Sequence, residues 1–130
     1  MKQLQTVFLI AVTLFSTTPL HAQEATEKAE ILDLIKTLAR LTDMADACGE
    51  HMNYFGKKAL EGEVCKEFNQ AYHDQWPTRA ALQQQVSDYT VRLQKGDYTC
   101  DTCEVMLQRV EELRITVTYY LDYMDFVKTF

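Results

Sequence analysis

The stretch from Cys100 to Phe130, CDTCEVMLQRVEELRITVTYYLDYMDFVKTF, decides the fold of this chain. Apolar residues recur along it at alternating steps of three and four, the spacing of one face of an α-helix in a bundle. Thr99 is its expected N-cap. Roughly 30 residues at 1.5 Å each predict a helix about 45 Å long. Its expected buried face consists of Cys103, Met106, Val110, Leu113, Val117, Tyr120, Met124 and Val127.

Two regions in the first half of the chain are expected to be helical. One runs from about Glu24 to Cys48, because apolar residues recur along it at the same spacing, and Gly49 is placed to end it. The stretch 50–76 is less regular and predicts a short helix, a turn near Glu61-Gly62 and a second helical segment. The expected buried residues are Ile31, Leu34, Leu38, Leu41, Ala45, Cys48, Val64, Cys65, Phe68, Ala71 and Tyr72.

A third expected helix runs from about Thr78 to Lys95, between Pro77 and Gly96. Its expected buried face consists of Leu82, Val86, Tyr89 and Leu93. Two prolines and four glycines leave little material for strands or tight hairpins. These segments predict an all-α fold, a single-domain antiparallel bundle of about four helices that spans residues 23–130.

Residues 1–22 have the features of a cleavable signal peptide. Lys2 is followed by an apolar run from Val7 to Phe15, shorter than the ~20 residues that a membrane-spanning helix needs. Leu20-His21-Ala22 ends on a small residue suited to cleavage, so Gln23 is the expected first residue of the mature protein. We therefore expect a periplasmic or secreted protein with no membrane insertion after the signal is removed.

Four cysteines in an exported chain predict two disulfides. In an antiparallel bundle the end of the first helix lies near the start of the last helix. We therefore expect bridges that join Cys48 and Cys65 to the Cys100/Cys103 pair. Four cysteines allow three connectivities, however, and the sequence does not choose among them.

The motif Cys100-Asp101-Thr102-Cys103 has other interpretations. At a helix N-terminus, free amides and the macrodipole stabilise a thiolate, which is the basis of an alternative function as a thiol-disulfide redox protein. Asp101 and the lack of predicted strands argue against it. A four-cysteine zinc site needs two close pairs, but Cys48 and Cys65 are far apart in sequence. Glu104 stands where a c-type haem motif has histidine.

No catalytic constellation is present in the sequence. His51 and His73, the histidines that remain after signal removal, sit in polar surroundings, and no serine lies in a Gly-x-Ser-x-Gly turn. No pair of carboxylates stands in an apolar context that would raise a pKa. We therefore expect a protein that is not an enzyme and that carries no metal and no cofactor.

The charge balance bears on the kind of partner. The net charge is −6, and the basic residues are scattered singly apart from Lys57-Lys58. Such a surface does not favour nucleic acid or anionic lipid. A basic protein is the partner that it favours.

A second apolar face lies on the C-terminal half of the last helix, and we call it the aromatic stripe. Its residues lie opposite the buried face at about 100° per residue. Either the last helix is central and the stripe is buried within the domain, for instance by the Asn53-Tyr54-Phe55 region, or the stripe is an interface with another protein or in a homodimer. The aromatic stripe consists of Ile115, Tyr119, Tyr123, Phe126 and Phe130.

In its signal, size and cysteine content the chain resembles small exported bacterial helical proteins, among them immunity proteins that neutralise secreted toxins. A rigid domain without a catalytic constellation most often works by binding. We therefore expect a periplasmic inhibitor or immunity-type protein that occludes a toxic enzyme, for example a cell-wall-degrading one. The alternatives are the redox protein above and a periplasmic chaperone or secretion adaptor.

Overall fold

The computed structural model describes residues 20–97 and 100–130, and the side chains within 26–97 and 100–130. This part of the chain is helical and contains no strand, which confirms the all-α prediction. The helices are α2 (Leu20–Phe55), the 3-10 helix η1 (Gly56–Glu61), α3 (Glu63–Gln75), α4 (Arg79–Gln94) and α5 (Cys103–Lys128).

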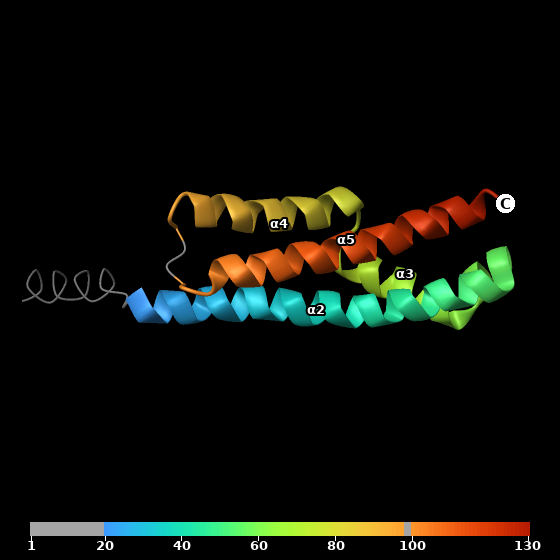
Figure 1. The fold of residues 1–130 in the computed structure, drawn as a ribbon, viewed down its shortest axis with the longest axis horizontal. Coiled ribbons are helices and arrows are strands. Elements are labelled where there is room, and N and C mark those ends of the chain that lie inside the picture. The colour runs from blue at the N-terminus through green and yellow to red at the C-terminus, as the bar shows by residue number, and fades with distance from the viewer. Residues whose placement is uncertain (1–19, 98–99) are drawn as a thin grey trace, which may run out of the picture.

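The two long helices, α2 and α5, lie side by side and run in the same direction (Figure 1). Lys28 forms an ion pair with Asp101 at 3.1 Å near one end, and Asn53 accepts a hydrogen bond from Tyr123 at 3.0 Å near the other. The expected antiparallel alternation is therefore wrong for this pair. The reason is that α3 and α4 follow one another along the return path, so together they take the place of one returning helix (Figure 1).

The first helix extends past Gly49 to Phe55, so the expected end at Gly49 is wrong. Gly49 has no positive φ, whereas Gly56 has a φ of 59° and follows the true end of α2. A Cβ atom at Gly49 would lie 2.5 Å from Cε1 of Tyr120 in α5. Glycine is therefore present at this position because two helices approach each other closely, and not because the helix ends.

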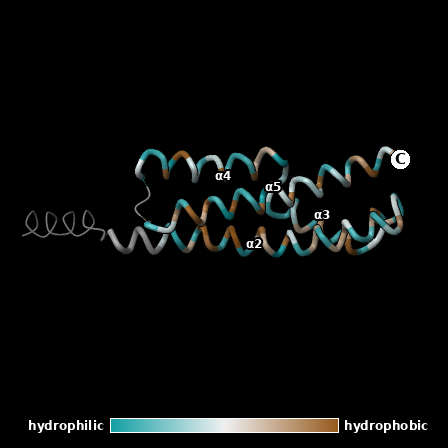
Figure 2. Tube along the Cα trace, in the orientation of Figure 1, coloured by the Kyte–Doolittle hydropathy of each residue, from teal (hydrophilic) through white to brown (hydrophobic). Residues whose placement is uncertain are grey.

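A single hydrophobic core connects the helices, and in Figure 2 hydrophobic positions recur along α2 between hydrophilic ones. The expected apolar face of α2, from Ile31 to Cys48, is buried and is extended by Met52. In α5 the expected face is buried except for Met106 and Tyr120, which are partly buried at its edge. Leu107 and Leu121 are buried in addition, because α5 contacts α2 on one flank and α4 on another.

The step from α3 to α4 is held by side-chain hydrogen bonds. The indole of Trp76 donates to Oε1 of Gln85 at 2.7 Å, and the hydroxyl of Tyr72 donates to the carbonyl of Thr78 at 3.3 Å. Thr78 caps α4 by accepting from the amide of Ala81 at 3.1 Å. At the other end of α4, Gly96 has a φ of 78°, as expected for a helix stop. The expected cap Thr99 lies outside the described residues.

The cysteines form two disulfides, Cys48–Cys65 and Cys100–Cys103. The prediction that all four are bridged is confirmed, but the favoured pairing between the two groups is wrong. Because α2 and α5 run in parallel, the start of α5 lies beside Lys28, about 20 residues or 30 Å along α2 from Cys48. Cys48 instead meets Cys65 on α3, which folds back along α2.

The predicted signal segment lies mostly outside the described residues, and its cleavage stays a prediction. Helix α2 begins at Leu20 and thus runs through the predicted cleavage point. Within the described part of the chain, no helix is long and apolar enough to cross a membrane.

Candidate functional site

The aromatic stripe of α5 is largely exposed to solvent. Ile115 is 54%, Tyr119 60%, Phe126 56% and Phe130 76% exposed, whereas Tyr123 is partly buried. Tyr119 and Phe126 each lie two residues from a buried core residue, Leu121 and Met124, and two residues correspond to about 200° around a helix. The exposed residues of the stripe therefore face away from the core.

The segment that was expected to bury the stripe does not do so. Tyr54 is 87% and Phe55 63% exposed at the end of α2. Asn53 alone reaches the stripe, through the hydrogen bond that it accepts from Tyr123. Residues 53–55 therefore do not bury the stripe, and within the described residues four of its five side chains are open to solvent.

Ring contacts hold the stripe together as a surface. The rings of Tyr119 and Tyr123 are nearly parallel, with 12° between their planes and 6.4 Å between their centroids. Phe126 and Phe130 meet edge to face at 4.9 Å. Tyr119 also meets Tyr120 edge to face at 5.3 Å, which connects the stripe to the seam between α5 and α2. The rings thus form two clusters on one face of α5, the tyrosines and then Phe126 with Phe130, which we call the aromatic ridge.

Carboxylates from α2 border this ridge at the Tyr119 end. Asp46 and Glu50 are exposed and one helical turn apart. Asp46 forms a hydrogen bond with the hydroxyl of Tyr120, and Glu50 acts on this hydroxyl through its negative charge. The hydrogen bond to Asp46, together with partial burial and the nearby negative charges, raises the pKa of Tyr120 above its ordinary value of 10.0. Residue spacing carries no signal for this arrangement, because residues 46 and 120 are brought together only by the parallel packing of α2 and α5.

The acidic residues of α5 from Glu111 to Asp125 form ion pairs within the molecule. Arg79 of α4 pairs with both Asp122 and Asp125. The remaining pairs each lie within one turn of α5: Arg109 with Glu112 at 3.1 Å, Arg114 with Glu111 at 2.5 Å and Lys128 with Asp125 at 3.7 Å. Among the described residues no ion pair engages Asp46 or Glu50, so these two carboxylates retain their charge for an external group.

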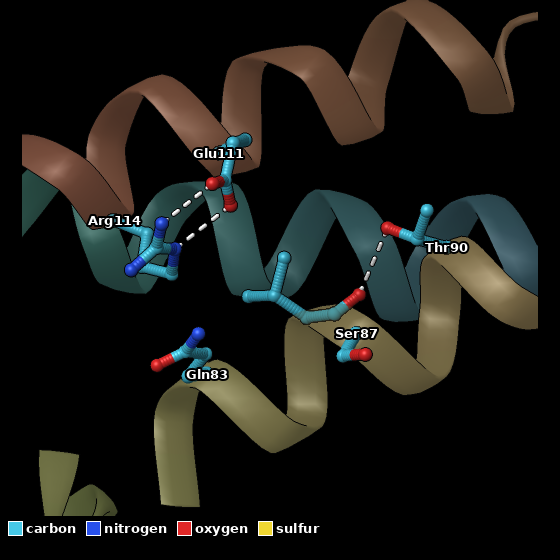
Figure 3. A pocket seen from close by; sticks show the side chains of 6 residues that line it. Gln83, Ser87, Thr90, Glu111 and Arg114 are labelled. Atoms are coloured by element: carbon cyan, nitrogen blue, oxygen red, sulfur yellow. Dashed lines mark hydrogen bonds and ion pairs between the residues drawn. The ribbon is translucent and has the colours of Figure 1, made fainter. Parts of the chain in front are cut away.

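A hollow of about 320 Å³ lies between α4 and α5 (Figure 3). Figure 3 shows Glu111 and Arg114 of α5 facing Gln83 and Ser87 of α4 across it. Arg114 donates two hydrogen bonds to Glu111, which lower the pKa of the Glu111 carboxyl and raise that of the guanidinium. Glu111 and Arg114 are paired with each other, so neither is placed to activate the hydroxyl of Ser87, which also lines the hollow.

A second hollow, of about 360 Å³, lies between α3 and α5 and includes one of the two histidines considered above. His73 contacts the carbonyl of Asn69 at 2.8 Å through Nδ1, and Arg79 on the rim is engaged by Asp122 and Asp125. No serine, threonine or cysteine lines this hollow. The other histidine, His51, meets the ring of Phe55 at 6.0 Å. The histidines are therefore not brought together with a nucleophile.

The Cys100–Cys103 bridge closes a Cys-x-x-Cys motif at the start of α5, where the redox alternative requires it. Cys103 is fully buried and Cys100 is 6% exposed. Thiol exchange needs in-line access of an attacking thiolate to one sulfur, and this burial opposes such access. Within the described residues no group of three or more metal-ligating side chains is clustered.

We compared the chain with known proteins in three ways. A scan against protein-family models, a search of curated proteins and a search of solved structures each found no match.

Proposed function

We propose that this chain is an exported binding protein that recognises a basic protein partner through the aromatic stripe of α5. The observation that carries the proposal is the exposure of the stripe: four of its five residues are more than half exposed. Contiguous exposed rings are costly in water, and tyrosine and phenylalanine are enriched in protein interfaces. Nothing within the described part of the chain covers them.

The charge around the stripe supports a basic partner. Asp46 and Glu50 border it without a cation of their own, and the whole chain carries a net charge of −6. Complementary charge speeds association and disfavours wrong partners, whereas buried rings supply most of the affinity. We expect exposed rings along one face of a single helix to fit a cleft in the partner.

An inhibitor or immunity-type protein in the periplasm meets these conditions. It needs a rigid scaffold, which two disulfides and one core provide, and a surface that plugs the cleft of a toxic enzyme. Enzymes that degrade the anionic cell wall are a suitable target class, because many of them are basic. Binding alone is sufficient for this role, so the chain needs no active site of its own.

A panel of purified basic cell-wall hydrolases, lysozymes among them, tests the proposal. The protein is expected to bind and inhibit at least one of them, and Tyr119→Ala with Phe126→Ala should weaken binding more than tenfold. The matched control is Tyr54→Ala with Phe55→Ala, which removes two rings outside the stripe that are at least as exposed and should change affinity less than twofold.

Two results would overturn the proposal. One is the absence of binding and inhibition across the panel. The other is a dimeric mass in solution that the Tyr119/Phe126 variant converts to a monomeric one, since the stripe would then be covered by a second copy of the chain.

The redox alternative keeps one observation in its favour, the Cys100–Cys103 bridge itself. Thiol titration in graded redox buffers separates the two functions. A bridge that opens only below about −300 mV is structural, whereas one that opens near −200 mV or above favours thiol–disulfide exchange. The burial of both sulfurs supports the structural outcome.

A further inference from the structure

The tyrosines of the stripe and the carboxylates of α2 can attract a cation in two ways, through ring faces and through negative charge. Tyr119 presents an exposed ring, nearly parallel to that of Tyr123 and 5.3 Å from that of Tyr120. Asp46 lies at the hydroxyl of Tyr120, and Glu50 lies one turn further along α2. Ring faces attract cations through their quadrupole, and carboxylates do so through charge.

We propose that this place, formed by Tyr119, Tyr123, Asp46 and Glu50, is the subsite that binds an arginine side chain of the protein partner. This inference rests on the proposed function, because the arginine belongs to the protein that is proposed to bind the stripe. A planar guanidinium can stack on the Tyr119 ring and donate hydrogen bonds to a carboxylate at its edge. A lysine ammonium offers a point charge and lacks the planar face.

The ion pairs of the molecule single out this place. On α5 itself, every acid from Glu111 to the C-terminal end already has a basic partner: Arg114 pairs with Glu111, Arg109 with Glu112, and Arg79 with Asp122 and Asp125. Only on the α2 side do carboxylates lie beside exposed rings without a cation among the described residues. An incoming guanidinium there breaks no existing ion pair.

The packing of α2 on α5 gives the subsite its shape. Gly49 lies between Asp46 and Glu50 in sequence and allows the ring of Tyr120 to approach the backbone of α2. This approach brings the two carboxylates to the hydroxyl of Tyr120, whose ring meets that of Tyr119 at 5.3 Å. The hydrogen bond from Tyr123 to Asn53 holds the second ring of the subsite in place.

A hexa-arginine peptide is the probe for the test, with hexa-lysine as the comparison and the Tyr119, Tyr120 and Tyr123 ring signals in NMR as the readout. The arginine peptide should bind at least threefold more tightly than the lysine peptide. Asp46→Asn with Glu50→Gln should weaken arginine binding at least fivefold. Tyr119→Leu should remove the preference for arginine over lysine, because it keeps an apolar side chain but removes the ring.

The matched control is Glu30→Gln with Asp33→Asn. It removes the same charge from α2, but more than three helical turns away from Asp46 and the tyrosines of the stripe. The subsite is overturned if the control weakens binding as much as the Asp46/Glu50 variant, or if the ring signals do not move at saturating peptide. The two proposals fail separately. If the arginine peptide does not bind but a hydrolase still binds through the stripe, only the subsite is refuted. If the arginine peptide binds but no hydrolase does, only the proposed function is refuted.

Discussion

Gly49 of α2 lies directly against the ring of Tyr120 of α5, so closely that a Cβ atom would stand 2.5 Å from Cε1 of that ring. Gly49→Ala should therefore destabilise the protein by about 1–3 kcal/mol, because the clash outweighs the gain in helix propensity of about 1 kcal/mol. Chemical unfolding measures the effect. In a Tyr120→Leu background the same substitution should cost much less. A stabilising Gly49→Ala would contradict the close approach of the two helices.

The two disulfides should differ in their contribution to stability. Cys48–Cys65 closes a longer loop, with a sequence separation of 17 against 3 for Cys100–Cys103. Loop-closure entropy predicts a loss of about 3 kcal/mol for Cys48→Ala with Cys65→Ala and about 2 kcal/mol for the other pair. Urea denaturation of both double variants checks the order. Peptide mapping without reduction checks the pairing itself, and a cross-linked peptide that joins Cys48 to Cys100 or Cys103 would refute it.

Arg79 ties the start of α4 to α5 through Asp122 and Asp125. Arg79→Met keeps most of the aliphatic stem and removes the ion pairs. Because all three side chains are partly exposed, the expected loss is only about 0.5–1 kcal/mol, and it should shrink at high salt. Hydrogen exchange should show faster exchange in α4 but not in α2. Arg109→Met is the control, since its pair with Glu112 lies within α5 and should leave α4 unchanged.

The titration of Tyr120 should report its contact with Asp46. The hydrogen bond to Asp46 raises the pKa of the phenol above 10.0, and Asp46→Asn should lower it towards that value by removing the negative charge. The folded state thus holds the phenolic proton more tightly than the unfolded state. This contribution to stability is complete below pH 10 and is lost as the pH rises through the raised pKa. NMR titration of the ring carbons checks the direction, and an unchanged pKa in the variant would contradict the contact.

Periodicity allowed most of the helices to be predicted, but not where the first one ends. The three-and-four spacing from Ile31 to Cys48 identified the buried face of α2 correctly. A glycine that follows a buried helical face has two physical explanations. It can end the helix in the left-handed conformation, or it can allow another helix to approach closely, and local sequence does not separate the two. At Gly96 the stop was correct, whereas at Gly49 the contact with Tyr120 was the cause.

The candidate site shows the same division. The sequence alone determined that α5 carries two apolar faces and that one of them contains Ile115, Tyr119, Tyr123, Phe126 and Phe130, because that follows from residue spacing on a regular helix. Only the tertiary structure decided that this second face is open and that Asp46 and Glu50 border it. Exposure, disulfide pairing and charge neighbours depend on which helices lie side by side and in which direction. That arrangement is set by contacts between residues distant in sequence, such as Lys28 with Asp101 and Asn53 with Tyr123.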